Sequence, residues 1–155
     1  MGQIQPGEPA PDFELPDQND TRVRLSQFRG ENPVVLFFYP KDDTTGCTVE
    51  ACTFRDEMAR FDAFRAKIIG ISSDSDEEEW REFTVKNKMI WPQYLDHDRR
   101  IQRAFGIHAF PTYILIDHEG IVRFSSIGAG WLRAANLSDA VNKQIKIVAR
   151  STEAR

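Results

Sequence analysis

The stretch that most constrains the fold is an apolar run, Val34–Tyr39, which is followed at once by Pro40. A short continuous apolar run bounded by turn residues predicts a strand that is buried on both faces. Because proline cannot extend a central strand, we expect the chain to leave the sheet at Pro40. Polar turn residues continue to Gly46, and an amphipathic helix is predicted after them. The pattern favours an open α/β sheet, in which functional groups usually lie beyond the carboxyl ends of the strands.

Cys47 is predicted at the N-terminus of this helix or one turn inside it. The free N–H groups and the positive dipole end of a helix stabilise a thiolate, so this position favours a reactive cysteine. The hydroxyl group of Thr44 can donate a hydrogen bond to the sulfur. The alternative is a structural cysteine, since cysteine is among the most buried residue types. The polar turn residues that precede Cys47 argue against that alternative.

Cys52 is the second cysteine, five residues further on. In one continuous helix the Cα atoms of residues five apart lie about 8.7 Å from each other. A disulfide requires a separation of roughly 4.4–6.8 Å, so Cys47 and Cys52 cannot bond while both belong to an intact helix. We therefore expect the first helical turns to unwind if the pair is oxidised. The alternative is that Cys52 is a small apolar packing residue.

The spacing Pro40-x-x-x-Thr44-x-x-Cys47 resembles the active-site motif of the peroxiredoxins. The longer stretch from Phe38 to Cys52 is similar to the peroxiredoxin Q subfamily, also called bacterioferritin comigratory protein. This resemblance implies a thioredoxin-like fold and thiol-dependent reduction of peroxides, without a metal, haem or flavin. A hydroperoxide substrate and a thioredoxin-like protein reductant are implied as partners.

The resemblance also implies roles for individual residues. Cys47 would be the peroxidatic cysteine and Cys52 the resolving cysteine, which together form an intramolecular disulfide. Thr44 would hydrogen-bond the thiolate and the peroxide, while Pro40 would shield the pocket. Three further residues are expected to line the substrate pocket: Phe38, Glu50 and Pro111.

One position departs from the family pattern. Peroxiredoxins usually carry an arginine six residues before the aspartate that ends a later strand, and here that aspartate is Asp117 and the position is Pro111. The segment from Phe110 to Asp117 instead resembles thioredoxins, in which a cis-proline faces the active cysteine, so a cis bond before Pro111 is expected. Whether another arginine substitutes is left open by the sequence, and three were considered: Arg99, Arg123 and Arg133.

The remaining elements follow from periodicity. Segments with apolar alternation or short apolar runs predict further strands: Phe13–Leu15, Val23–Leu25, Ile68–Ser72, Gln93–Asp96, Thr112–Ile116 and Ile121–Ile127. A helical turn is expected at Ser26–Gly30 with Ser26 as its cap, and a helix from Asp98 to Phe105 that ends at Gly106. Ser75 and Glu78 form a predicted capping box. The helix after them is expected to bury three side chains: Trp80, Phe83 and Val85.

These elements predict an α/β chain with a thioredoxin-like fold: a central mixed β-sheet, helices on both faces and an N-terminal β-hairpin extension. The 155 residues are long enough for one domain, expected to span residues 1–155. The net charge of −4, with mixed signs, argues against nucleic-acid binding. No apolar run is long enough to span a bilayer, and residues 1–11 do not resemble a secretory signal, so a cytoplasmic location without membrane association is expected.

A bound metal is not expected, because only three histidines could join the two cysteines and no pair has the usual close spacing. His97 and His118 lie in polar turns and are expected to be solvated. His108 precedes Pro111 and either approaches the active thiol or is an ordinary loop residue.

The sequence therefore favours a thiol peroxidase that acts through Cys47 and Cys52, as a monomer or weak homodimer. The alternative is a thioredoxin-like thiol–disulfide oxidoreductase that acts on protein disulfides. Four residues separate the two cysteines, whereas that chemistry normally has two. The preferred peroxide, the physiological reductant and the oligomeric state are not determined by the sequence.

Overall fold

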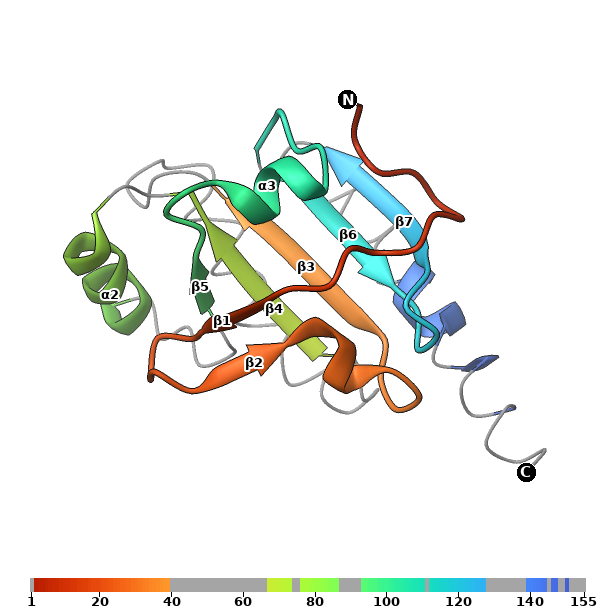
Figure 1. Ribbon diagram of the computed structural model, residues 1–155. Coiled ribbons are helices and arrows are strands. Elements are labelled where there is room, and N and C mark those ends of the chain that lie inside the picture. Colours follow the sequence, from red (N-terminus) through yellow and green to blue (C-terminus); the bar gives the residue numbers. More distant parts are fainter. Residues whose placement is uncertain are drawn as a thin grey trace.

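The computed structural model describes residues 2–39, 67–73, 76–86, 93–110, 112–127, 139–144, 146–147 and 150. Within these residues the chain forms a five-stranded sheet with the strand order β5–β4–β3–β6–β7 and a separate two-stranded hairpin, β1–β2 (Figure 1). The predicted mixed sheet with an N-terminal hairpin is confirmed. The sheet consists of β3 (Val34–Tyr39), β4 (Lys67–Ser72), β5 (Gln93–Leu95), β6 (Thr112–Ile116) and β7 (Val122–Ile127).

The central strand is β3, and it coincides with the predicted apolar run. It pairs in parallel with β4 on one side and antiparallel with β6 on the other. Every residue from Val34 to Phe38 is at most 2% exposed. A strand that is buried on both faces is apolar at every position, so the continuous apolar run predicted its location correctly.

The two faces of the sheet have separate aromatic contacts. Phe38 belongs to the main core cluster, and its ring centroid lies 5.7 Å from that of Phe105. On the same side Phe13 meets Tyr94 edge-on at 5.7 Å. Because side chains alternate along a strand, the neighbouring Phe37 points to the opposite face. There its ring stacks on Tyr113 at a centroid distance of 5.1 Å.

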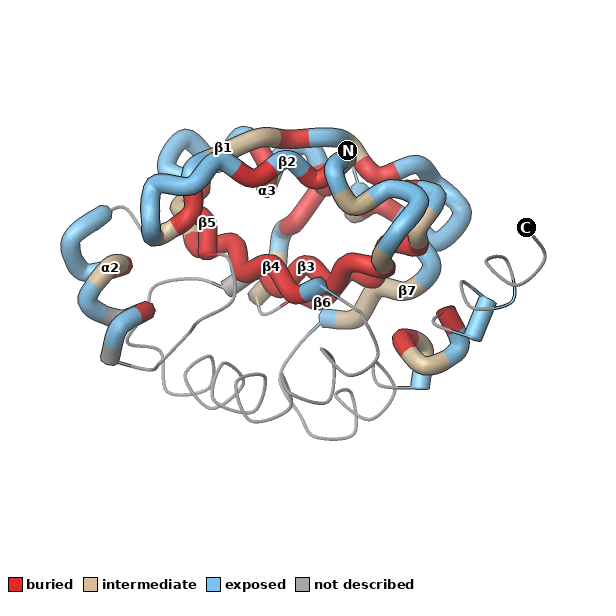
Figure 2. The backbone as a smooth tube through the Cα atoms, turned by 90° about the horizontal axis from the view of Figure 1, so that it is seen from below, coloured by how far each residue is buried: buried red, intermediate tan, exposed pale blue. Residues whose placement is uncertain are grey.

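One layer above the sheet is made by the N-terminal part of the chain and a short helix. The hairpin of β1 (Glu14–Pro16) and β2 (Arg22–Arg24), the 3-10 turn η1 (Leu25–Phe28) and the helix α3 (Arg100–Ala104) form this layer. Figure 2 shows the buried strands β3 and β4 beneath β1, β2 and α3. Ile101 and Phe105 are 2% and 1% exposed and mark the inward side of this helix.

The opposite face of the sheet meets helical residues near the end of the chain. Residues 139–144 and 146–147 are helical and are called the terminal helix below. Its Val141 is fully buried. Leu115 of β6 lines a pocket together with Ala140 and Gln144 of this helix. The predicted helical cover on both faces is therefore present in the described residues.

The first ten residues are held by backbone hydrogen bonds to distant parts of the chain. The amide of Ile4 donates to the carbonyl of Phe105 at 3.0 Å, and the amide of Gly7 donates to the carbonyl of Val122 at 2.7 Å. The amide of Ala10 donates to the carbonyl of Gly120 at 2.9 Å. Gly106, with a φ of +66°, allows the close approach, because a Cβ there would lie 2.2 Å from the carbonyl oxygen of Gly2.

The start of α2 (Glu77–Lys86) differs from the prediction by one residue. A carboxylate oxygen of Asp76 accepts a hydrogen bond from the amide of Glu79 at 3.1 Å, so Asp76 caps this helix. The predicted cap, Ser75, lies outside the described residues, and so does its expected pairing with Glu78. The acidic first turn suits the positive end of the helix dipole.

The predicted burial along α2 is correct only in part. Trp80 is 2% exposed, but Val85 is 78% exposed and does not face the core. The side chain of Phe83 lies outside the described residues. At the edge of a sheet a short helix buries a narrow stripe, so an apolar residue beyond that stripe remains on the surface.

The expected serine cap at Ser26 is wrong. Ser26 lies inside η1, and the residue that precedes the turn is Arg24. The amide of Ser26 donates to Oδ1 of Asp12 at 2.9 Å. This contact joins residues fourteen apart in the sequence and holds the turn against the segment around Asp12. A local capping pattern does not predict a contact over that distance.

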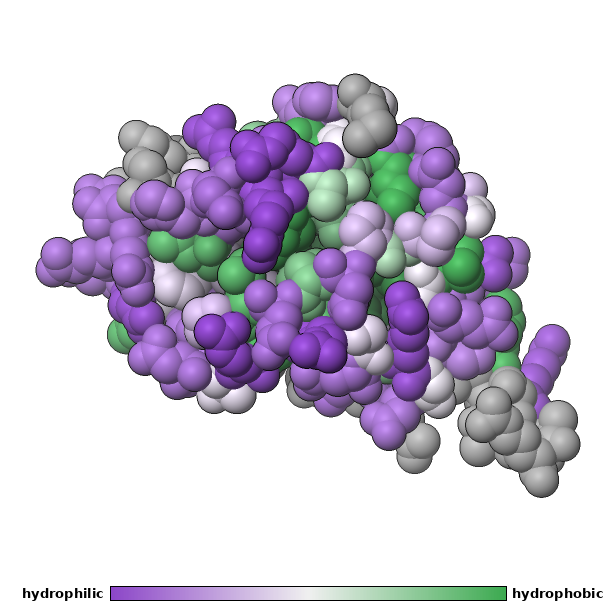
Figure 3. Space-filling model, viewed as in Figure 1, coloured by the Kyte–Doolittle hydropathy of each residue, from purple (hydrophilic) through white to green (hydrophobic). Residues whose placement is uncertain are grey.

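The surface over β1, β2 and α3 is mostly hydrophilic, with apolar side chains visible only in the gaps between polar ones (Figure 3). Among the described helices none combines the length and the apolar character needed to cross a bilayer.

Candidate functional site

Four strand ends meet at one edge of the sheet. Tyr39, the last residue of β3, lies opposite Ser72, the last residue of β4. Leu95 at the end of β5 lies on the other side of Ser72. β6 runs the other way and begins at this edge, with Thr112 opposite Phe38. This is the carboxyl edge of the parallel strands, where open α/β sheets usually bind their ligands.

Two of the predicted site residues adjoin, in the sequence, strand ends at this edge. Pro40 follows Tyr39 in the chain, and Pro111 precedes Thr112. The pairing of Phe38 with Thr112 brings the two attachment points together, although they are more than seventy residues apart in the sequence. Most of the predicted site residues lie outside the described part of the structure, and so does the expected cis bond: Pro40, Thr44, Cys47, Glu50, Cys52 and Pro111.

Phe38 is the predicted pocket residue that the structure describes. Its side chain is 1% exposed and packs against Phe105, which follows α3. The ring therefore packs in the core beneath this edge of the sheet. Its contribution to a substrate pocket stays a prediction.

Asp96, which directly follows β5, is a buried carboxylate at this edge. It is 2% exposed, and its amide donates to the carbonyl of Ser72 at 2.8 Å. Its two carboxylate oxygens accept the amides of Ile101 at 3.1 Å and Gln102 at 2.8 Å. Asp96 thus ties the start of α3 to the ends of β4 and β5. Burial raises the pKa of its carboxyl group, and the two amide donors oppose that rise.

Sequence analysis missed Asp96 because it treated this residue as the end of a strand. The signal that could have found it is an aspartate placed between a strand and a helix start, since such residues accept backbone N–H groups.

The raised pKa of Asp96 gives a pH-dependent stability with a defined sign. Below the ordinary aspartate pKa of about 4 its contribution to the free energy of unfolding is fully present, and it is lost as the pH rises through the raised folded value. We expect the stability advantage of the wild type over Asp96→Asn to shrink from pH 3 to pH 7. Urea unfolding across that range measures it, with the exposed Asp98→Asn as the control for a lost charge. An advantage that grows with pH would contradict the assignment.

Two of the three arginines considered above can be located. Arg99 precedes α3 in a left-handed conformation (φ 59°, ψ 23°). It lines a cavity of about 440 Å³ together with Gln102, Arg103 and His108. Among the described residues neither guanidinium group of this cavity has a hydrogen-bond acceptor. Gln102 and Arg103 of this lining belong to α3, which lies near the ends of β3 and β4 in Figure 1.

Arg123 lies at the other end of the sheet. Its Nε atom donates to Oδ2 of Asp117 at 2.7 Å, beyond the end of β6 that lies opposite Val34. It is therefore remote from the edge at which Tyr39 ends β3. Arg133 lies outside the described residues.

The histidines differ from one another in burial. His97 is exposed, as expected for a polar turn, and His108 is exposed beside the cavity of Arg99. The expectation that His118 is solvated is only partly correct. His118 is half-buried, and its Nδ1 atom is buried without a hydrogen-bond partner in the described structure. No cluster of three or more potential metal ligands occurs within the described ranges.

Known proteins resemble this chain in sequence and in fold. The model of the AhpC/TSA family matches residues 6–125. Chloroplastic peroxiredoxin Q from Oryza sativa subsp. japonica is 39% identical over 131 residues, which cover 79% of this chain and 59% of that protein. Peroxiredoxin Bcp from Escherichia coli (strain K12) is 35% identical over 125 residues, which cover 81% of this chain and 79% of that protein. The chain thus spans about three fifths of the length of the plant relatives that it matches.

Solved structures agree with the predicted fold. The crystal structure of peroxidoxin BcpB from Mycobacterium tuberculosis superposes with a TM-score of 0.74 at 29% identity, covering 97% of this chain and 98% of that chain. The thioredoxin domain of a thiol-disulfide oxidoreductase from Bacteroides vulgatus gives a TM-score of 0.77 at 25% identity, covering 90% and 99%. The thioredoxin-like fold and the resemblance found in the sequence are both confirmed.

Proposed function

We propose that this chain, which belongs to the AhpC/TSA family, is a thiol-dependent peroxidase that reduces hydrogen peroxide and organic hydroperoxides. The observation that carries the proposal is the end of β3 at the carboxyl edge of the sheet. The residue that follows Tyr39 opens the stretch Pro40-x-x-x-Thr44-x-x-Cys47, so a candidate nucleophile follows directly from the edge that suits ligand binding. The peroxiredoxin names of the relatives point to the same chemistry.

The reaction has three steps. The Cys47 thiolate attacks the terminal oxygen of the hydroperoxide, the O–O bond breaks, and water or an alcohol leaves after protonation. Cys47 is thereby oxidised to a sulfenic acid. The Cys52 thiol then condenses with this group, which forms the Cys47–Cys52 disulfide and releases water. A dithiol protein of the thioredoxin type reduces the disulfide by exchange and becomes oxidised itself.

The other residues of the motif support these steps. The Thr44 hydroxyl group would hold the thiolate and the peroxide by hydrogen bonds, and Pro40 would restrict access of water to the sulfur. Phe38, Glu50 and Pro111 would shape the pocket. The disulfide step requires the first turns of the helix after Gly46 to unwind, because residues five apart in an intact helix are too far apart to bond.

The experiment that tests the function follows thiol loss in the reduced protein during stepwise addition of hydrogen peroxide. We expect two thiols to be lost for each peroxide consumed, with the disulfide identified by mass spectrometry. In parallel, the oxidised protein should be reduced by a thioredoxin system, and reduction of insulin disulfides should be negligible. Fast insulin reduction with negligible peroxide consumption would instead establish the alternative thiol–disulfide oxidoreductase.

The partners and the assembly are part of the same proposal. We propose a thioredoxin-like donor as the reductant and a monomer or weak homodimer as the working form. Light scattering across a range of protein concentrations would measure the assembly, and a stable larger oligomer would contradict it. The cytoplasmic location and the extent of a single domain over residues 1–155 stay predictions.

A further inference from the structure

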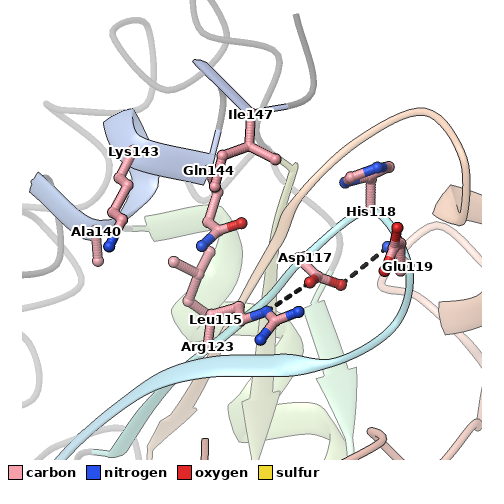
Figure 4. A pocket seen from close by; sticks show the side chains of 9 residues that line it. All are labelled: Leu115, Asp117, His118, Glu119, Arg123, Ala140, Lys143, Gln144 and Ile147. Atoms are coloured by element: carbon pink, nitrogen blue, oxygen red, sulfur yellow. Dashed lines mark hydrogen bonds and ion pairs between the residues drawn. The ribbon is translucent and has the colours of Figure 1, made fainter. Parts of the chain in front are cut away.

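A second pocket lies at the end of the sheet opposite the candidate site. It has a volume of about 550 Å³, within the range of small-molecule sites in proteins. The turn after β6, at residues 117–119, forms one wall, and the terminal helix forms the other (Figure 4). Because Ile116 pairs with Val34 at the beginning of β3, this turn is separated from Tyr39 by the length of the central strand.

Gln144 offers a polar group to this pocket. Its side chain is directed into the pocket, above Leu115 and toward Asp117 (Figure 4). The residue is only 7% exposed, yet its amide forms no hydrogen bond with any described residue. The amide atoms of Gln144 are not among the fully buried unpaired side-chain atoms of the described structure, so solvent in the pocket reaches them and a ligand with acceptor oxygens can replace that solvent. Nδ1 of His118, another residue of this lining, is a fully buried atom without a partner among the residues the structure describes.

Arg123 supplies a fixed cation beside this amide. Its Nε atom is held by Oδ2 of Asp117 at 2.7 Å, and the Asp117 side chain is only 4% exposed. The other carboxylate oxygen of Asp117 is already occupied by the amides of Glu119 and Ile121, each at 2.9 Å. The guanidinium group is thus positioned by a saturated carboxylate, while its two terminal nitrogens have no acceptor among the described residues.

The remaining lining residues limit the class of ligand that the pocket can bind. A guanidinium fork suits the parallel oxygens of a carboxylate, and a preorganised fork loses little entropy on binding. Lys143, next to Gln144, adds a second positive charge. The carboxylate of Glu119 at the rim disfavours anions of higher charge. Leu115 and Ile147 supply apolar walls.

We propose that this pocket binds a small organic monocarboxylate. Its carboxylate accepts hydrogen bonds from the terminal nitrogens of Arg123 and from the Gln144 amide. Its hydrocarbon part contacts Leu115 and Ile147. Lys143 strengthens the attraction without a fixed hydrogen bond. The site is separate from the candidate peroxidase site, and the proposal does not depend on the peroxidase activity.

Calorimetric titration of the full chain with benzoate tests the proposal directly. We expect saturable binding of one benzoate per chain. Benzamide, which has the same shape without the charge, should bind at least about tenfold more weakly, the size expected for losing a charged hydrogen bond. Inorganic phosphate should also bind more weakly than benzoate. Absence of saturable benzoate binding, equal binding of benzamide, or tighter binding of phosphate would each overturn the assignment.

Three substitutions place the binding in this pocket. Gln144→Leu keeps a similar volume but removes the amide, and should weaken benzoate binding about tenfold. Lys143→Gln should weaken it about threefold, the scale of an exposed ion pair. Lys146→Gln, on the exposed side of the same helix, is the matched control and should leave the affinity unchanged. Thermal melting checks that each variant is folded. If both variants fold and neither changes the affinity for benzoate, the site is refuted. If Gln144→Leu does not fold, an unchanged affinity in Lys143→Gln alone refutes it.

Discussion

Replacing Cys47 with serine is expected to abolish peroxide turnover, by roughly 10³-fold or more, which is the scale of losing a covalent nucleophile. A serine hydroxyl group at neutral pH is almost entirely protonated, and its oxygen does not provide the redox steps that sulfur does. The assay is steady-state consumption of hydrogen peroxide with a thioredoxin system as the donor.

Cys52→Ser is the matched control for that experiment. It leaves the nucleophile in place, so the first peroxide should still be consumed and a sulfenic acid should accumulate on Cys47. Dimedone labelling followed by mass spectrometry detects that species. Turnover with the protein donor should fall strongly, because the disulfide that the donor attacks no longer forms. Retained turnover in Cys47→Ser, or loss of the first turnover in Cys52→Ser, would contradict the assigned roles.

Phe38→Ala is expected to cause a large loss of stability. The ring is 1% exposed and contacts Phe105, and truncation of a buried phenylalanine costs about 3–5 kcal/mol. Since small domains have only about 5–15 kcal/mol of stability in total, a partly unfolded population is expected near physiological temperature. Urea unfolding monitored by tryptophan fluorescence measures the change.

Two comparison variants make the Phe38 result interpretable. Phe38→Leu retains most of the apolar contact and should lose clearly less stability than the alanine variant. Ile127→Ala, at the 44% exposed end of β7, should change the free energy of unfolding by no more than about 0.5 kcal/mol. A loss in Phe38→Ala as small as that in Ile127→Ala would show that the ring is not part of the core.

The strands were the part of the fold best predicted from the sequence. β3 and β4 carry continuous apolar residues because both of their faces are buried. Such a run predicts a buried strand whatever the register of its pairing with the neighbouring strands. β6 and β7 follow the two predicted runs Thr112–Ile116 and Ile121–Ile127 closely, and Gly120 in the turn between them adopts a φ of +85°. In these segments the local sequence and the tertiary environment demand the same residues.

The helix caps were predicted less well, for a reason visible in the residues themselves. Residues 73–76 alternate serine and aspartate, and each of these can cap a helix, so the choice of Asp76 depends on where β4 ends. Ser26 failed as a cap because the turn begins one residue earlier, at Leu25, and the contact of the Ser26 amide with Asp12 lies fourteen residues away in the sequence. Val85 has an apolar side chain, and only the position of α2 decides that it faces water.

The two candidate sites likewise differ in how far the sequence predicts them. The peroxidase motif is a local pattern with fixed spacing, so it could be recognised in one pass along the chain. The pocket of Gln144 joins a strand, a turn and a helix that are separated in sequence, and no local pattern marks it. Asp96 was missed for a related reason: its role depends on burial, which arises only when α3 packs against the ends of the strands.

The hydrogen bonds of Ile4, Gly7 and Ala10 to residues 105–122 have a consequence during synthesis on the ribosome. Residues 4–10 leave the exit tunnel about a hundred residues before the segments that hold them in the folded chain. Contacts of such wide sequence separation slow the search for the native topology. A nascent chain that stops before residue 122 lacks partners for this segment and leaves the apolar side chains of Ile4 and Ala10 exposed, which makes early release a route to aggregation.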